Sequence, residues 1–185
     1  MGPTEDLDAW ACEVFRYRDL IECGETWARL RPDNRPRQAA TYAAIAALGR
    51  DVLDPIAKAL GRPLLTYGFA GPNLTRNIGG RIAPRLDQHA GHELTVRGAL
   101  VCPRLGQAVD LHVPGHDART LAALIINQTP FDRLYFYGAD RPVHVSRGPQ
   151  ESRSVVLMRP TGGRLMPMRL SGEALRDWLR ESDRH

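Results

Sequence analysis

Four of the six histidines in this sequence lie in three short segments, two of which also carry carboxylates. These segments are 87–93 (Asp-Gln-His-Ala-Gly-His-Glu), 106–112 (Gly-Gln-Ala-Val-Asp-Leu-His) and 141–146 (Arg-Pro-Val-His-Val-Ser). Imidazole nitrogens and carboxylate oxygens are usual ligands of Zn²⁺, and a catalytic zinc site has three protein ligands and one position open to water. The grouping therefore predicts a mononuclear metal site.

Asp110 is the strongest ligand candidate because it interrupts the apolar run 108–113. A carboxylate in such a run needs a cation or several hydrogen-bond donors as partners. His144 lies between two valines and is either a ligand or a hydrogen-bonded core histidine. His112 lies two residues after Asp110 and faces the same side of the strand. It is either a metal ligand or a neighbour of the site. Segment 87–93 supplies two more candidates, His89 and His92, since histidines three apart can share one face of a helical turn.

The elements that must position these residues follow from hydrophobic periodicity and turn signals. The sequence predicts helices at both ends of an αβ body and a long helix over 39–60 that ends at Gly61. It also predicts a helix over 118–127 with Asp117 as N-cap and a last helix after Ser171. Segment 22–27 is interpreted as a helix connection, and Gly71-Pro72-Asn73 as a turn. The remaining elements are a short helix over 4–15, strands over 64–69, 108–113, 133–137 and 143–146, and a hairpin pairing 154–159 with 165–170.

Composition limits the class of protein. The chain has 185 residues, 43% of them hydrophobic, which suits one compact core. The sequence contains no run of about 18 uncharged apolar residues, so it predicts no membrane span. Its N-terminal residues do not resemble a secretory signal. Three cysteines match no disulfide pattern, although one of them could bind metal. We therefore expect a cytoplasmic protein. The formal charge of +4 comes mainly from arginine, since Lys58 is the single lysine, and indicates a solvated basic surface or an anion site.

The order of three motifs resembles the zinc D-Ala-D-Ala carboxypeptidase and phage endolysin family, which shares its fold with the Hedgehog signalling domain. The motifs are 67–74 followed by Ile78-Gly79-Gly80, then 106–110, then 130–134 leading to 143–146. The resemblance covers roughly residues 39 to 149. It implies an α+β fold, with an antiparallel sheet and flanking helices in one domain. Residues 1–38 would be an N-terminal helical extension, 39–150 the DD-peptidase-like core, and 151–185 a hairpin and helix packed on that core.

The resemblance also implies a zinc site. Asp110 and His144 map directly onto two of the family's ligands. The third ligand falls at Pro103, which cannot bind metal, but Asp87-Gln88-His89 is similar to the family's Ser-Gln-His. The resemblance thus makes His89 the first choice for the third ligand and His92 the second. An insertion from about His92 to Leu105 would have to loop out for His89 to complete the site.

Two departures from the family concern catalysis. Ala70 stands where the family has its substrate-polarising arginine, and Arg141 stands where it has its general-base glutamate. Loss of the general base would slow proton transfer by about 10²- to 10⁴-fold. Glu93 is the candidate replacement base, and Arg81 or Arg85 the replacement cation. We also predict that Arg85, Tyr137 and Arg141 bind substrate.

Three hypotheses follow. The first is a divergent zinc-dependent hydrolase that acts by metal-activated water on a small polar or anionic substrate, either a small molecule or a peptide-like compound. The second is a catalytically inactive binding module of the same fold, which four protein ligands such as His89, His92, Asp110 and His144 would support. The third is a nucleic-acid-associated protein, for which the arginine excess is the only argument.

Overall fold

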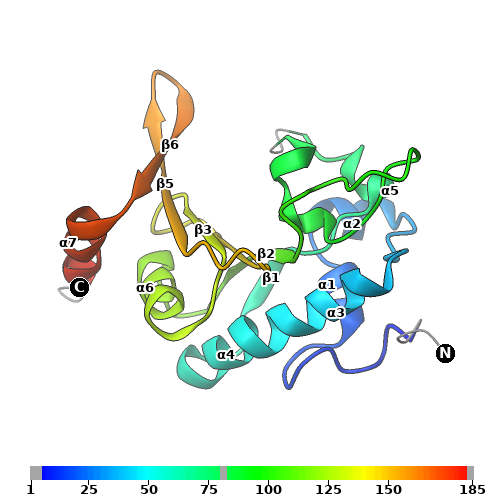
Figure 1. The fold of residues 1–185 in the computed structure, drawn as a ribbon. Helices are drawn as coiled ribbons and strands as arrows, with labels where there is room; N and C mark the ends of the chain where they lie inside the picture. The colour runs from blue at the N-terminus through cyan, green and yellow to red at the C-terminus, as the bar shows by residue number, and fades with distance from the viewer. Residues whose placement is uncertain (1–5, 80–82, 183–185) are drawn as a thin grey trace.

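The computed structural model describes residues 6–79 and 83–182, with the side chains of residues 181 and 182 excepted. It is an α+β fold built on a six-stranded sheet of order β1-β2-β4-β3-β5-β6, as Figure 1 shows. The strands are β1 (Leu64–Tyr67), β2 (Gln107–His112), β3 (Arg133–Phe136), β4 (Val143–Arg147), β5 (Ser154–Thr161) and β6 (Arg164–Leu170). The α+β class and the flanking helices are confirmed.

The sheet is mixed, so the prediction of an antiparallel sheet is wrong in one pairing. Strand β5 runs parallel to β3, while the other four pairings are antiparallel. The cause is the order of the strands. Since β4 returns antiparallel to β3 and β5 then pairs on the far side of β3, β5 must point in the same direction as β3.

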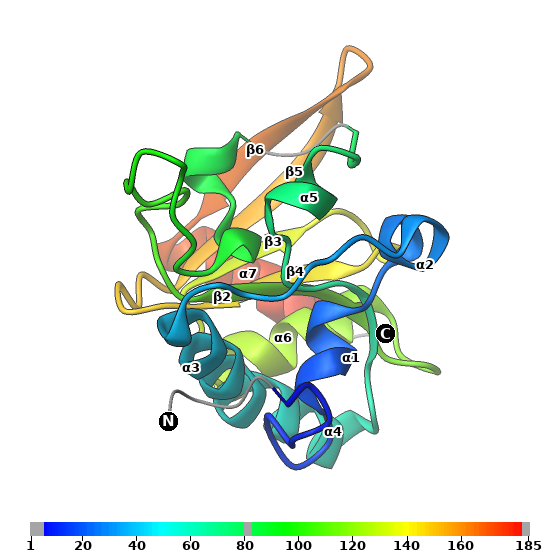
Figure 2. The same ribbon diagram turned by 90° about the vertical axis from the view of Figure 1, so that its right-hand side faces the viewer.

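The two faces of the sheet are covered differently. The helices are α1 (Tyr17–Ile21), α2 (Glu25–Leu30), α3 (Ala39–Leu48), α4 (Asp54–Leu60), α5 (Pro72–Thr75), α6 (Ala118–Gln128) and α7 (Gly172–Ser182). One face packs on α1, α3, α4 and α6, while α2, α5 and the segment leading to β2 lie over the other, as both ribbon views show (Figure 1, Figure 2). The apolar core lies between the sheet and the helices on the first face. The segments over the other face form a second layer, which covers the side of the sheet that carries His144.

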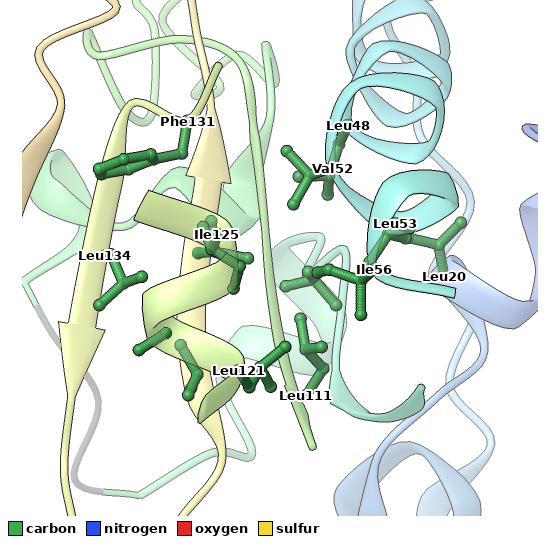
Figure 3. Packing of buried hydrophobic residues seen from close by; sticks show 14 of the residues in the cluster. Leu20, Leu48, Val52, Leu53, Ile56, Leu111, Leu121, Ile125, Phe131 and Leu134 are labelled. Carbon is green, nitrogen blue, oxygen red and sulfur yellow. The ribbon is translucent and has the colours of Figure 1, made fainter. Parts of the chain in front are cut away.

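The core lies between the long helix, α6 and the sheet. In Figure 3 the side chains of Leu48, Val52 and Ile56 point toward α6 and toward Leu111 of β2. All four of these side chains are fully buried. The same apolar cluster contains Leu7 and Phe15 from the N-terminal segment and Trp178 from α7, so both ends of the chain contribute to one core.

The predicted helix over 39–60 is continuous, but a π-helical turn at Gly49–Leu53 separates α3 from α4. Pro55 lies two residues after this turn, lacks an N–H and would clash with a carbonyl in a regular α-helix. A wider turn relieves such a clash. The helix ends at Gly61, whose φ of 94° favours glycine.

Other predicted elements are confirmed or corrected. Asp117 caps α6 by accepting a hydrogen bond from the Thr120 N–H at 2.7 Å. Among the described residues of the predicted helix over 4–15, turns and bends replace the helix, and Trp10 forms a bridge with Arg16. The turn predicted at 71–73 is instead the start of α5. No helix in residues 6–79 and 83–182 has the length and apolar content to cross a bilayer.

Candidate metal centre

Strand register brings two of the predicted ligands together. Asp110 of β2 is paired directly with His144 of β4. Their neighbours Val109, Leu111 and Val145 are fully buried in the core, so alternation places Asp110 and His144 on the opposite face of the sheet. A carboxylate and an imidazole therefore lie side by side on the sheet face that the second layer covers.

His89 reaches the same point from the covering layer. It lies in a short 3₁₀ turn, Gln88–Ala90, which begins where the Asp87 Oδ1 accepts a hydrogen bond from the His89 N–H. The His89 Nδ1 lies 2.8 Å from the carbonyl oxygen of Gly68. Because a carbonyl can only accept, Nδ1 carries a proton, and Nε2 is the ring nitrogen that faces the sheet.

A buried polar network ties this turn to the sheet. The Ser146 hydroxyl donates to the Gln88 Oε1 at 2.9 Å, and the Gln88 Nε2 donates to the Asp132 Oδ2 at 3.0 Å. Ser146 and Asp132 are fully buried and Gln88 is nearly so. Since buried polar groups are costly to leave unpaired, this network fixes the position of His89 next in the chain.

Three ligand atoms converge in a small triangle. The His89 Nε2 lies 3.2 Å from the His144 Nδ1 and 3.3 Å from the Asp110 Oδ1. The third side, from the His144 Nδ1 to the Asp110 Oδ1, measures 2.8 Å. Ligand atoms bound tetrahedrally to Zn²⁺ at normal bond lengths lie roughly 3.3 Å apart. This buried His-Asp-His group could hold a metal ion. Two of its three sides have the spacing of tetrahedral zinc ligands, and the third, between His144 and Asp110, is shorter.

The electrostatics of the triangle call for a positive charge. Burial disfavours a protonated imidazole, but the Asp110 carboxylate outweighs burial and raises the pKa of His89 above the ordinary histidine value. Burial likewise opposes ionisation of Asp110, yet the two imidazoles hold its pKa well below that of an ordinary aspartate. Without a cation, the Nε2 lone pair of His89 would face a carboxylate oxygen. Either a proton or a metal ion satisfies this arrangement.

A cavity of about 320 Å³ opens over the triangle. Its walls come from the start of α2, from β1 and α5, and from the end of β3. The described lining residues are Cys23, Gly24, Glu25, Thr26, Trp27, Thr66, Tyr67, Leu74, Ile78, Asp87, His89, Asp110, Tyr137 and His144. The three candidate ligands thus line a cavity with room for a small molecule.

The predicted general base, Glu93, has a different role. Its carboxylate is 2% exposed and accepts hydrogen bonds from the N–H groups of Arg37 and Gln38 and from the Thr41 hydroxyl. These groups lie at the start of α3, so Glu93 caps that helix. It is not among the residues that line the cavity, and its contacts give it a structural role at the start of α3.

His92 is also placed away from the triangle. Its Nε2 accepts a hydrogen bond from the Gly106 N–H at 3.1 Å, and burial lowers its pKa. The residues after it loop out as predicted, with a bridge between Leu94 and Leu100. His89 is therefore the histidine that segment 87–93 contributes, and His92 holds the base of the loop.

The predicted substrate-binding residues are separated in space. Tyr137 lines the cavity. Arg141 and His112 line a different cavity beside the start of α6. Arg85 is exposed and is not among the residues that line the metal cavity. Arg81 lies outside the described residues.

The sequence did not predict the cavity wall that lies at the start of α2. Cys23, Glu25 and Trp27 line the cavity although they precede the first ligand by more than sixty residues. Segment 22–27 has the features of a helix connection, and no local signal shows that it packs beside β1. Asp87 is a wall residue with a local signal, because it directly precedes the Gln-His pair.

Comparisons with known proteins give no family for this chain: no protein-family model, no curated protein and no solved structure matches it.

Gly68 offers a test of how His89 is oriented. A Cβ at this position would lie 2.1 Å from the Leu20 carbonyl oxygen, so Gly68→Ala must displace the strand end whose own carbonyl accepts from His89. Loss of such a supporting hydrogen bond lowers metal affinity by about 10- to 100-fold. We expect that decrease in a chelator-competition titration. Gly79→Ala is the control, because a Cβ there has no atom within 4 Å, and equal affinities in the two variants would contradict the assignment.

Proposed function

We propose that the protein is a divergent zinc-dependent hydrolase in which His89, Asp110 and His144 hold the metal. The observation that carries this proposal is the triangle of ligand atoms, with sides of 3.2, 3.3 and 2.8 Å, at the base of a cavity. Three protein ligands with an accessible fourth position are typical of catalytic zinc sites, whereas structural sites have four. The motif order supports a relationship to the zinc D-Ala-D-Ala carboxypeptidases and their Hedgehog-type fold.

Zinc in such a site lowers the pKa of a bound water and polarises the bond to be cleaved. The residues of this chain orient the ligands and form the substrate cavity. The carbonyl of Gly68 orients His89, and the pairing of β2 with β4 orients Asp110 and His144. A cavity of about 320 Å³ fits a small molecule or the end of a peptide-like chain. We propose a small polar substrate of that size.

The pH dependence of stability gives a prediction for this site. A histidine pKa that is raised by folding stabilises the metal-free protein below the unfolded pKa of about 6.5, and this stability is lost as the pH rises through the folded pKa. Zinc binds the neutral imidazole, so its contribution increases with pH. We therefore expect zinc to increase the thermal midpoint more at about pH 9 than at about pH 6, with proton release on binding at the lower pH. A zinc effect that decreases with pH would contradict the proposed ligands.

The test of the hydrolase proposal uses the full chain purified without added metal. We expect about one zinc per chain by mass spectrometry, and zinc-dependent hydrolysis in a screen of small esters and amides. Both should be lost in His89→Ala and in His144→Ala. His116→Ala is the matched control, since His116 lines the other cavity. Absence of stoichiometric metal from the wild type, even after reconstitution, would rule the proposal out.

A binding module that has lost turnover is the second candidate. Its support is that Glu93 caps a helix and Arg141 lies in another cavity, so neither replaces the general base. Stoichiometric zinc with no hydrolysis in the same screen would favour this candidate. For nucleic-acid association the surface to test is the β5–β6 hairpin, where segment 153–171 has four arginines and no acidic residue. Only strongly salt-dependent binding would support that role.

A further inference from the structure

Tyr137 reaches the metal cavity through strand alternation. Phe136 points to the core, where its ring meets Trp178 edge-on with ring centres 5.2 Å apart. The residues on either side of Phe136 must then face the opposite layer. Tyr135 does so, because it is paired with His144 and their ring centres lie 5.1 Å apart. Tyr137 follows on the same face and lines the cavity together with the three ligands.

The phenol of Tyr137 is available to a ligand. Neither a hydrogen bond nor an ion pair joins Tyr137 to any other residue in the described part of the chain. By contrast, the nearby Thr66 hydroxyl donates to the Asp110 carbonyl at 3.1 Å, and the Tyr135 hydroxyl lies 3.5 Å from the Arg104 Nη1. Burial, followed by the charge of Asp110, raises the pKa of Tyr137 to about 12. Tyr137 therefore keeps its proton at neutral pH and presents an O–H donor to the cavity.

A hydrolase that acts on an acyl group needs such a donor. When water adds to a carbonyl carbon, negative charge collects on the carbonyl oxygen, and a donor already aimed at that oxygen lowers the barrier. Ala70, at the position of the family's polarising arginine, has no charged side chain. The predicted cationic residues Arg85 and Arg141 do not line this cavity. Among the described lining residues, Tyr137 is an O–H donor without a protein partner on the same sheet face as Asp110 and His144.

We propose that Tyr137 donates a hydrogen bond to the acyl oxygen of the substrate and that the substrate is accordingly an ester or amide rather than a phosphate ester. This inference rests on the proposed hydrolase function. Tyr137 neither gains nor loses a proton, so no further acid or base is needed at that position. It becomes a catalytic residue because it contacts the oxygen on which charge develops.

The experiment compares zinc-loaded full-length wild type, Tyr137→Phe and Tyr17→Phe. Tyr17 is a suitable control because its buried ring packs edge-on against Tyr42 at 5.4 Å, outside the cavity. The probes are p-nitrophenyl acetate for turnover and acetohydroxamate for binding. We expect Tyr137→Phe to retain one zinc per chain and to lose about 10²-fold or more in kcat, with a smaller change in KM. Acetohydroxamate should bind at least about tenfold more weakly.

The outcomes separate this inference from the proposed function. If the wild type binds no zinc, the proposed function fails and the inference fails with it. If zinc is bound but Tyr137→Phe matches the wild type in kcat and in acetohydroxamate affinity, only the role of Tyr137 is overturned. A zinc-loaded wild type that neither hydrolyses the ester nor binds acetohydroxamate, yet hydrolyses p-nitrophenyl phosphate, would overturn the acyl substrate class. A loss of zinc in Tyr137→Phe would make Tyr137 a positioning residue and also contradict the proposal.

Discussion

Asp110→Asn is expected to lower zinc affinity by about 10³-fold or more, because the amide that replaces the carboxylate removes the one anionic ligand. The effect should be large because the Asp110 Oδ1 lies at the centre of the ligand group, at 3.3 Å from the His89 Nε2 and 2.8 Å from the His144 Nδ1. A neutral oxygen at the same place can accept hydrogen bonds but cannot compensate a divalent ion. Competition against a chromogenic chelator at constant pH measures the affinity.

The matched control is Asp117→Asn, which changes an exposed capping aspartate at α6. It should leave zinc affinity within about twofold of the wild type and lower stability by at most about 1 kcal/mol. The metal-free Asp110→Asn protein should also lose the raised pKa of His89, because that shift is due to the carboxylate. If Asp110→Asn kept wild-type zinc affinity, the metal would have to bind elsewhere.

Glu93→Ala should destabilise the fold by roughly 2 to 4 kcal/mol while leaving stoichiometric zinc binding intact in the folded protein. The carboxylate is buried and accepts from two backbone N–H groups and one hydroxyl at the start of α3. Removing it leaves those buried donors unpaired. Denaturant unfolding with zinc present gives the change in the free energy of unfolding.

Glu93→Gln separates the capping role from a catalytic one. A general base would lose about 10²- to 10⁴-fold in turnover on this change, with little loss of stability. A helix cap should instead lose stability with a much smaller change in turnover. Glu151→Ala is the control for surface charge, since the Glu151 carboxylate is exposed and forms an ion pair with Arg147, and surface pairs contribute about 1 kcal/mol or less.

The sequence predicted the parts of the site that depend on local pattern. Alternation around Asp110 and His144 was enough to place both on strands, because core valines and leucines flank them. The N-cap at Asp117 and the end of the long helix at Gly61 were equally local. His89 was found through the Gln-His pair once the insertion after His92 was allowed to loop out.

Predictions failed where tertiary contacts decide. Glu93 adjoins His92 in the sequence, but its carboxylate turns toward α3, more than fifty residues earlier. Likewise, nothing in segment 22–27 indicates that Trp27 would line the metal cavity. The parallel pairing of β3 with β5 also depends on strand order, which no local pattern encodes.

The most direct test of the central claim is anomalous X-ray diffraction at the zinc edge from crystals of the zinc-loaded protein. We expect one strong peak bounded by the His89 Nε2, the Asp110 Oδ1 and the His144 Nδ1, at about 2.0–2.2 Å from each. The fourth position should face the cavity that Tyr137 lines. A peak ligated by other residues, or no peak within bonding distance of all three atoms, would contradict the account.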